Sequence, residues 1–342
     1  MKAALFHEHG GPEKLRYEDF PTPEPGAGEV VVRVKACALN HLDLWVLGGI
    51  PGLPPSLPHI LGSDIAGDVA EVGHGVKGIA AGDRVVVDSS YSCGACEFCL
   101  RGETNLCVEY KIVGAGLHGG FAEFCKVPAR NIHPIPRGMS YEEIAATPLV
   151  FQTAWHMLVA RVGLRAGEDV LIQAAGSGTG TAAIQIAKLL GARVFATAGS
   201  DEKCAKAKEL GADEAINYKK KDFSEEVKRL TGGRGVDVVF DTVGADTWEK
   251  CLKSLARQGR LVTCGCTSGP TVQNDIRYLY MKHISIVGST MGTKGEFLTL
   301  LSLFGQGKLK PTIDRTFPLP EARAALEVMK GRGFFGKLVL TV

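Results

Sequence analysis

The sequence predicts an α/β protein built from two domains, a mostly β domain and a doubly wound parallel sheet of six strands. Two changes along the chain support this prediction. Residues 1 to about 150 hold short alternating apolar runs between glycines and prolines, whereas residues 152–290 alternate apolar strands with helical stretches. In addition, a turn containing Gly176, Gly178 and Gly180 lies between the first strand and the first helix of the second region.

The β domain is expected to be discontinuous. With 342 residues, the chain is long enough for two hydrophobic cores. Alternating runs at 29–35 and 83–87 predict strands, and the tail at 296–342 holds two amphipathic stretches and a final strand that we expect to rejoin this domain. The predicted boundaries are 1–151 and 291–342 for the β domain, with a cysteine-rich lobe at 88–112, and 152–290 for the parallel sheet.

The second domain repeats a strand and helix unit, which is typical of a parallel sheet with helices on both faces. The predicted strands are 170–173, 194–197, 215–217, 236–241, 259–265 and 284–288. The predicted helices are 179–190, 223–230, 247–255 and 275–283.

The glycine-rich turn predicts a dinucleotide site. Small residues let backbone N–H groups approach a diphosphate, and the positive end of the helix that follows attracts the anion. Such a turn alone is also compatible with an ordinary strand-to-helix connection. The rest of the chain has to decide between the two readings.

Four of the ten cysteines form a C-x2-C-x2-C-x7-C pattern, at Cys93, Cys96, Cys99 and Cys107. Four thiolates in one short segment are the ligand set of a tetrahedral zinc ion. Because every ligand comes from the protein, the expected zinc is structural. An iron–sulfur cluster would need a shorter last gap, and free or redox-active thiols are the remaining alternative.

The composition limits the partners and the location. A net charge of +2 argues against nucleic acid or an acidic membrane surface as a partner. The sequence has no apolar leader and no run long enough to span a membrane, and clustered cysteines favour metal binding over disulfides. We therefore expect a cytoplasmic protein that acts on a small molecule.

The chain resembles the medium-chain dehydrogenase/reductase superfamily from end to end. The motifs that carry the resemblance are Gly10-Gly11-Pro12-Glu13, Pro23-Glu24-Pro25-Gly26, Leu61-Gly62-Ser63-Asp64, Gly82-Asp83-Arg84-Val85, Gly119-Gly120-Phe121-Ala122 and the four-cysteine lobe. The resemblance implies a GroES-like catalytic domain joined to a Rossmann nucleotide-binding domain. It also implies an NAD(P)-dependent oxidoreductase.

The zinc alcohol dehydrogenases of this superfamily hold a second, catalytic zinc with two cysteines and a histidine. Matching the motifs puts Asn40 at the first cysteine, Ser63 at the histidine and Phe151 near the last ligand. These replacements resemble the quinone oxidoreductase branch, which has no catalytic metal. A zinc ion held instead with the help of a histidine, His41, His59 or His156, stays open as an alternative.

The resemblance also implies the site residues. The expected catalytic residues are Asn40 and Thr153 at the nicotinamide end, with Asp43 as a candidate proton relay. The plainer alternatives are a turn cap for Asn40, a helix N-terminal hydroxyl for Thr153 and a backbone cap for Asp43. The expected cofactor-binding residues are Ser177, Gly178, Thr179, Gly180, Ser200, Lys203, Tyr218, Gly244 and Gly265.

The second strand bears on the choice of cofactor. NAD enzymes usually place a carboxylate there for the ribose 2′-hydroxyl, but this chain reads Thr197-Ala198-Gly199-Ser200. Ser200, Lys203 and Tyr218 can hold a 2′-phosphate, as their counterparts do in the quinone oxidoreductase branch. The sequence therefore favours NADPH, and Asp201 keeps NADH open.

We expect hydride transfer from NADPH to a quinone or an α,β-unsaturated carbonyl without a catalytic metal. The alternatives are an alcohol or aldehyde dehydrogenase with an atypical catalytic metal site and a non-catalytic NADPH-binding protein. The resemblance implies a homodimer or homotetramer that pairs the edge strand at 284–288. The side chains of Trp45, Leu53, Ile60 and Met291 suggest an apolar substrate cleft.

Overall fold

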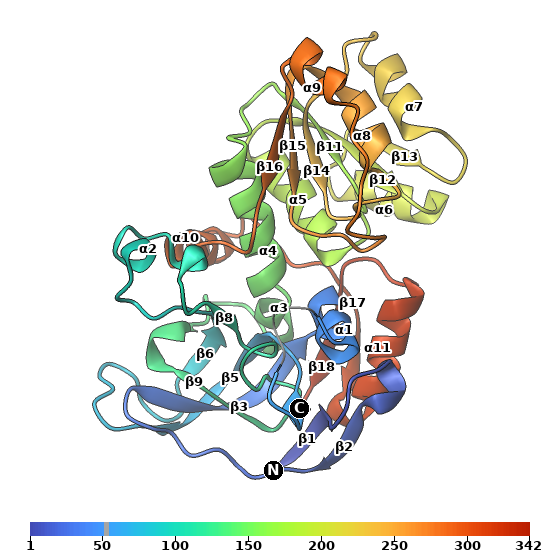
Figure 1. The fold of residues 1–342 in the computed structure, drawn as a ribbon. Helices are drawn as coiled ribbons and strands as arrows, with labels where there is room; N and C mark the ends of the chain where they lie inside the picture. The colour runs from blue at the N-terminus through green and yellow to red at the C-terminus, as the bar shows by residue number, and fades with distance from the viewer. Residues whose placement is uncertain (51–54) are drawn as a thin grey trace. The chain divides into compact units, whose positions relative to one another are not determined.

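The computed structural model describes residues 1–50 and 55–342, so Leu53 lies outside the described residues. The chain forms two compact units. The first comprises Met1–Leu149 and Thr293–Val342, and the second comprises Val150–Gly292. The first unit therefore contains both ends of the chain (Figure 1).

The second unit contains a parallel sheet in the order β13-β12-β11-β14-β15-β16 (Figure 1). This order confirms the predicted doubly wound sheet, because the chain runs outward from β11 in one direction and then from β14 in the other. The strands are β11 (Asp169–Ile172), β12 (Arg193–Ala198), β13 (Glu214–Asn217), β14 (Val236–Asp241), β15 (Leu255–Thr263) and β16 (Ser285–Gly288).

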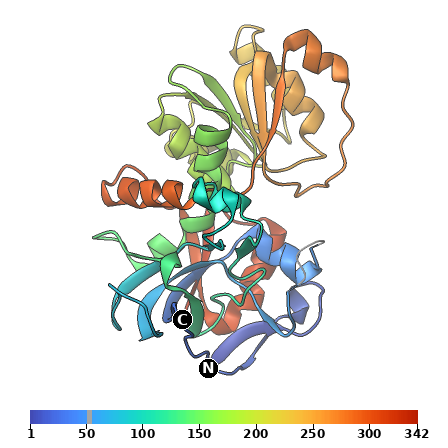
Figure 2. The same cartoon turned by 60° about the vertical axis from the view of Figure 1, so that its left-hand side comes forward.

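Helices cover both faces of this sheet, as the turned view shows (Figure 2). Phe195, Phe223 and Trp248 belong to the core between the sheet and one layer of helices. The helices are α4 (Pro148–Trp155), continued by a π-helix at His156–Arg161, α5 (Gly178–Leu189), α6 (Asp201–Glu209), α7 (Phe223–Leu230), α8 (Trp248–Ser254) and α9 (Ile276–Lys282).

One predicted strand boundary was wrong. β15 begins at Leu255, before the predicted 259, because Leu255 already pairs with Val236 ahead of an irregularity in the register. Gln258 has a φ of 60° within this stretch, which is uncommon for a residue other than glycine. The early part of the strand has no regular apolar alternation, so its sequence did not distinguish it from a loop.

The first unit is built on sheets whose strands pair antiparallel, except that β17 pairs parallel with β18. Its main sheet has the order β10-β6-β5-β3-β18-β17, and β9 also pairs with β3. The strands of this unit are β1 (Lys2–Phe6), β2 (Arg16–Asp19), β3 (Glu29–Ala38), β4 (His59–Ile60), β5 (Asp64–Val72), β6 (Arg84–Val87), β7 (Ser90–Tyr91), β8 (Lys111–Ile112), β9 (Phe124–Pro128), β10 (Ile132–Pro134), β17 (Ile313–Pro318) and β18 (Lys337–Thr341).

Short helices connect these strands, and two longer ones come from the tail. They are α1 (His41–Gly48), α2 (Glu97–Leu100), α3 (Tyr141–Ala145), α10 (Lys294–Gly305) and α11 (Ala322–Gly331). None of the helices in the described ranges is both long and apolar enough to cross a membrane.

The last strand of the chain, β18, lies inside the main sheet of this unit, between β3 and β17. In the register, Val339 of β18 lies opposite Ala38 of β3, and Asp64 of β5 lies opposite the same Ala38 on the other side. The end of β3 is therefore flanked by the starts of β5 and β18. This register brings together three segments that are far apart in sequence.

Candidate functional site

The glycine turn lies at the carboxyl end of β11, next to β14, where the strand order reverses. Ser177 is the N-cap of α5, and its Oγ accepts the Gly180 N–H at 3.0 Å. A Cβ on Gly180 would lie 2.3 Å from the Ala174 carbonyl oxygen, so only glycine allows this close approach of helix and strand. The first-turn N–H groups of Gly178 and Thr179 have no acceptor within the helix and can bind a phosphate.

Two further glycines lie after the neighbouring strands. Gly244 has a φ of 88°, and its N–H donates to Asp241 Oδ2 at 3.0 Å. A Cβ on Gly265 would lie 3.0 Å from the Thr242 carbonyl oxygen. Gly244 therefore belongs to a turn and Gly265 to a close approach of two segments, both at the carboxyl edge of the sheet, where doubly wound folds bind nucleotides.

The end of β12 holds the residues expected near the ribose. Ser200 caps α6 and accepts the Lys203 N–H at 3.2 Å. A Cβ on Gly199 would lie 2.7 Å from Tyr218 Oη, so the Tyr218 hydroxyl lies directly against this turn. Asp201 is engaged elsewhere, because it accepts Asn217 Nδ2 at 2.7 Å and pairs with Lys220.

Thr153 has a partner within the second unit. Its hydroxyl donates to Met291 Sδ at 3.7 Å, and both residues are buried. Met291 has a φ of 45°, which is uncommon for a non-glycine residue and marks a constrained turn after β16. The structure thus places Thr153 and Met291 side by side.

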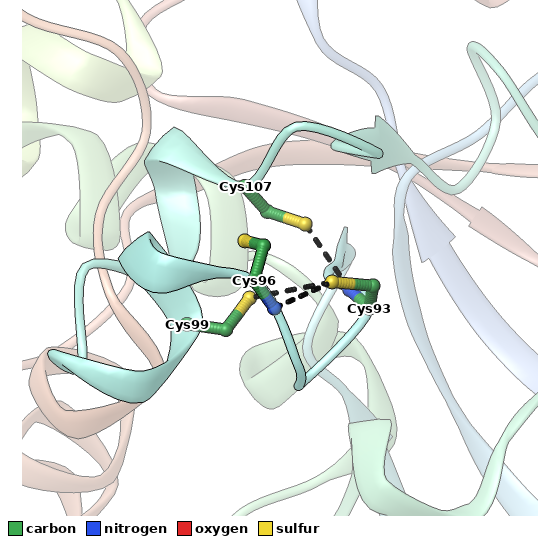
Figure 3. A group of neighbouring side chains, drawn as sticks. All are labelled: Cys93, Cys96, Cys99 and Cys107. Atoms are coloured by element: carbon green, nitrogen blue, oxygen red, sulfur yellow. Dashed lines mark hydrogen bonds between the residues drawn. The ribbon is translucent and has the colours of Figure 1, made fainter.

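The four predicted cysteines converge in the first unit (Figure 3). Their sulfur atoms all lie within 4.8 Å of one another, and Cys93 Sγ and Cys99 Sγ are 4.0 Å apart. A tetrahedral zinc ion with bonds of about 2.3 Å needs sulfur atoms about 3.8 Å apart, so the arrangement fits this ion. Among residues 1–50 and 55–342, no other set of three or more potential ligands has this closeness.

Backbone N–H groups point at these sulfurs, as they do around thiolates. Cys93 Sγ accepts from Ala95 and Cys96, and Cys107 Sγ accepts the Cys93 N–H at 3.1 Å. Hydrogen bonds from the N–H groups of Cys99 and Val108 lower the pKa of Cys96 to about 6. Burial raises the pKa of Cys99 to about 11, so the hydrogen bonds favour a thiolate at Cys96, and a bound cation is needed to hold all four sulfurs as thiolates.

A second polar cluster lies at the end of β3 and contains Asn40, Asp64 and Lys337. Lys337 Nζ donates to Asn40 Oδ1 at 2.6 Å and to Asp64 Oδ2 at 2.9 Å. Asn40 Nδ2 also donates to Asp64 Oδ2 at 2.9 Å. We call these three residues the lysine cluster.

Asp43 lies beside the lysine cluster and is completely buried. Its carboxylate accepts the N–H groups of Asn40 at 2.7 Å and Gly62 at 3.1 Å. Burial raises the pKa of Asp43 to about 7, and the two hydrogen bonds and Lys337 oppose this rise. Asp43 can therefore exchange a proton near neutral pH, which a proton relay requires.

Sequence reasoning found Asn40 and Asp43 but missed Lys337 and the role of Asp64. The only local signal is a lysine at the start of an apolar strand, which usually means an exposed strand end. Ser63, the residue at the histidine position of zinc alcohol dehydrogenases, is fully buried, and its Oγ has no hydrogen-bond partner in the described part of the chain.

Two family models match the chain. Residues 26–137 match the alcohol dehydrogenase GroES-like domain, and residues 178–306 match the zinc-binding dehydrogenase family. These ranges include the four cysteines and most of the residues expected at the nucleotide site. They also include Asn40 and Asp64 of the lysine cluster, but not Lys337.

Similar proteins carry several activities. A solved structure of an NAD-dependent alcohol dehydrogenase is 48% identical, with a TM-score of 0.96 and complete coverage of both chains. Quinone oxidoreductase 1 of Escherichia coli is 34% identical over 98% of each chain. The acryloyl-coenzyme A reductase of Metallosphaera sedula is also 34% identical, over the full length of both chains. With this coverage the resemblance is confirmed: the chain belongs to the zinc-type medium-chain dehydrogenase/reductase superfamily and is an oxidoreductase.

Proposed function

We propose that the protein uses NADPH to reduce a quinone or an α,β-unsaturated carbonyl, without a metal ion at the reacting oxygen. The observation that carries this proposal is the lysine cluster. Where zinc alcohol dehydrogenases have a cysteine, this chain has Asn40, whose amide is bonded to the buried Lys337 ammonium. Where they have a histidine, it has Ser63, whose hydroxyl is uncharged. This donor set does not suit zinc, which prefers thiolate, imidazole and carboxylate ligands.

A conjugated acceptor fits such a site chemically. Reducing a simple carbonyl concentrates charge on one oxygen, which a Lewis-acidic metal normally stabilises. A quinone or enal spreads that charge over several atoms, so hydrogen bonds suffice. The nicotinamide supplies the hydride, and the protein supplies binding and orientation.

The residues of this chain divide these tasks in the proposal. Ser177, Gly178, Thr179 and Gly180 hold the diphosphate at the start of α5, with Gly244 and Gly265 shaping the neighbouring turns. Asn40 and Thr153 are the polar side chains proposed for the reacting end. Asp43 holds or releases a proton at its carboxylate, because its pKa of about 7 lies close to working pH.

The preference for NADPH is supported by the way Asp201 is engaged. The Asp201 carboxylate accepts a hydrogen bond from Asn217 and pairs with the Lys220 ammonium, so its negative charge is already balanced. Ser200 and Tyr218 lie together at the strand end, where a 2′-phosphate is bound in NADP enzymes. The rival is NADH, which the 48% identical alcohol dehydrogenase favours by its name.

We further propose that the cysteine cluster holds one structural zinc. All four ligand positions come from the protein, which leaves no coordination site for substrate or water. Elemental analysis should find one zinc per chain, and the Cys96→Ser variant should have lost it.

The decisive experiment measures oxidation of NADPH with a benzoquinone and with an enal, and reduction of NAD⁺ with primary alcohols. NADPH oxidation with either conjugated acceptor supports the proposal. Alcohol oxidation together with two zincs per chain, one of which survives Cys96→Ser, would establish the alternative of an alcohol dehydrogenase. Binding of NADPH with no turnover of any acceptor would indicate a non-catalytic binding protein.

The edge strand β16 supports the proposed homodimer. It pairs only with β15 in the sheet order, which leaves its other edge open, and Ile286 on this strand is exposed. Ile276, Tyr280 and Met281 of α9 are exposed as well. Light scattering of an Ile286→Lys variant should show monomers where the native chain forms dimers.

A further inference from the structure

Lys337 is a buried cation whose partners are both polar and both buried. Its side chain is 3% exposed, and the Asp64 side chain is 0% exposed. Lysine is almost never this deeply buried unless its charge is paired. The ammonium of Lys337 is paired through Asp64 and is also bonded to Asn40.

The lysine cluster accounts for almost every polar atom of its members. Asp64 Oδ1 accepts the Leu149 N–H at 2.8 Å, while Asp64 Oδ2 accepts from Asn40 and Lys337. The oxygen of the Asn40 amide faces the ammonium and its nitrogen faces the carboxylate, so the amide cannot flip without losing both bonds. The orientation of Asn40 is therefore set by Lys337 together with Asp64.

We propose that Lys337 is a positioning residue: its ammonium fixes the Asn40 amide and supplies the positive charge between Asn40 and Asp64. The proposal deepens the proposed reductase function and rests on it for the kinetic readouts. It assigns the last strand of the chain a role in the site. It also gives a physical reason why a metal ion does not fit: a divalent cation would lie beside an existing positive charge.

A purely stabilising role explains the lysine cluster poorly. Bringing two charges out of water is costly, and apolar residues of the same size often stabilise a fold as well as a buried ion pair does. The cluster also lies directly next to Asp43, which accepts the Asn40 N–H. An ion pair at this place influences the charge of the group proposed as proton relay.

The charges around Asp43 define the expected effect on pH. Asp43 faces Lys337 from β18, Asp64 from β5 and Cys37 from β3. Lys337 lowers the pKa of Asp43 and Asp64 raises it, in both cases less than burial does. Removing the ammonium should therefore raise the pKa of Asp43 further above its value of about 7.

The test compares Lys337→Met, Lys337→Arg and a control, Lys35→Met, in the full-length protein. Lys35 lies on β3 and is partly exposed, with only a long 4.0 Å pair to Asp68. We expect Lys337→Met to lower kcat about tenfold while the KM for NADPH changes less than about twofold, because the nucleotide residues lie in the other unit. The alkaline limb of the pH profile, where Asp43 loses the proton that it would donate, should move to higher pH. Lys337→Arg should recover most of kcat, and Lys35→Met should resemble the native chain.

Unchanged kcat and an unchanged pH profile in Lys337→Met would overturn the proposal, even if the variant unfolded at lower temperature. If Lys337→Met does not fold, the double variant Asp64→Asn/Lys337→Met takes its place with the same expected loss of kcat. Its pH profile should move less, because the two removed charges act on the pKa of Asp43 in opposite directions. A normal kcat in that double variant would equally overturn the proposal.

A substrate-free measurement separates this proposal from the proposed function. Because the folded-state pKa of Asp43 is raised above its unfolded value, the contribution of Asp43 to stability is complete below about pH 4 and is lost as pH rises through about 7. In Lys337→Met this loss should continue to higher pH, and Asp43→Asn should remove the difference. If the native chain reduces no acceptor but this shift is observed, the reductase function fails and the placement of Lys337 stands. If the shift is absent, the placement fails.

Discussion

Two polar clusters of the first unit were built in opposite ways. The four cysteines lie within residues 93–107, and one loop with a short helix brings them together (Figure 3). Asn40, Asp64 and Lys337 come from three strand ends, and Asn40 and Lys337 are separated by 297 positions. The comparison teaches that a local cluster can be recognised by its spacing, whereas a long-range cluster exists only through the register of the sheet.

The two clusters also differ in what completes them. The cysteine cluster gathers negative charge with no internal cation, which suits a metal ion. The lysine cluster contains its own cation and needs none from outside.

Cys96→Ser should have the largest effect, because a metal bound by four thiolates is coupled to the folding of its loop. We expect the variant to lose its zinc and, because metal binding is coupled to folding, to lose roughly several kcal/mol of stability. Elemental analysis and thermal unfolding measure both. Cys204→Ser, which changes a cysteine outside the cluster, is the matched control and should keep its zinc. Full zinc content in Cys96→Ser would contradict the cysteine-cluster assignment.

Asp64→Asn should destabilise the first unit by about 3–5 kcal/mol, because it leaves the Lys337 ammonium buried without a countercharge. Adding Lys337→Met to the same chain should recover much of this loss. Chemical denaturation of the native chain, both single variants and the double variant gives the coupling energy. Additive effects of the two substitutions would show that the charges do not interact.

Asp43→Asn should change the pH dependence more than the stability itself. The folded-state pKa of about 7 lies above the ordinary value of 3.8, so the contribution of Asp43 to stability should be lost between about pH 4 and pH 7. The variant cannot ionise at this position and should show a flatter profile. Unfolding temperatures measured across this range test the sign, and an equal slope in both proteins would refute the assignment to Asp43.

Ser63→Ala should have the smallest effect, and of the opposite sign. The buried hydroxyl lacks a partner in the described ranges, so removing it should raise stability by about 1 kcal/mol. Ser89→Ala is a useful comparison, since Ser89 Oγ is buried in the same way away from the lysine cluster. A stability loss in Ser63→Ala would mean that the hydroxyl is bonded in solution.

Much of the fold was predictable because its signals are local. Apolar runs separated by helical stretches predicted the six parallel strands. The glycine spacing predicted the turn, and the structure shows why Gly180 is needed there: a Cβ would collide with Ala174. β17 was not predicted, because its residues are mostly exposed or half-buried and show no apolar alternation. The place of β17 in the sheet is set by its pairing with β18.

The sequence by itself determined the family through its motifs, and the six parallel strands and the cysteine cluster through spacing and periodicity, which act within a few residues. Only the tertiary structure decided that Lys337 is buried against Asn40 and Asp64, and that Asp43 lies in an environment that raises its pKa. The physical reason is that burial and charge pairing depend on which strands become neighbours. Here the antiparallel pairing of β3 with both β5 and β18 makes that choice.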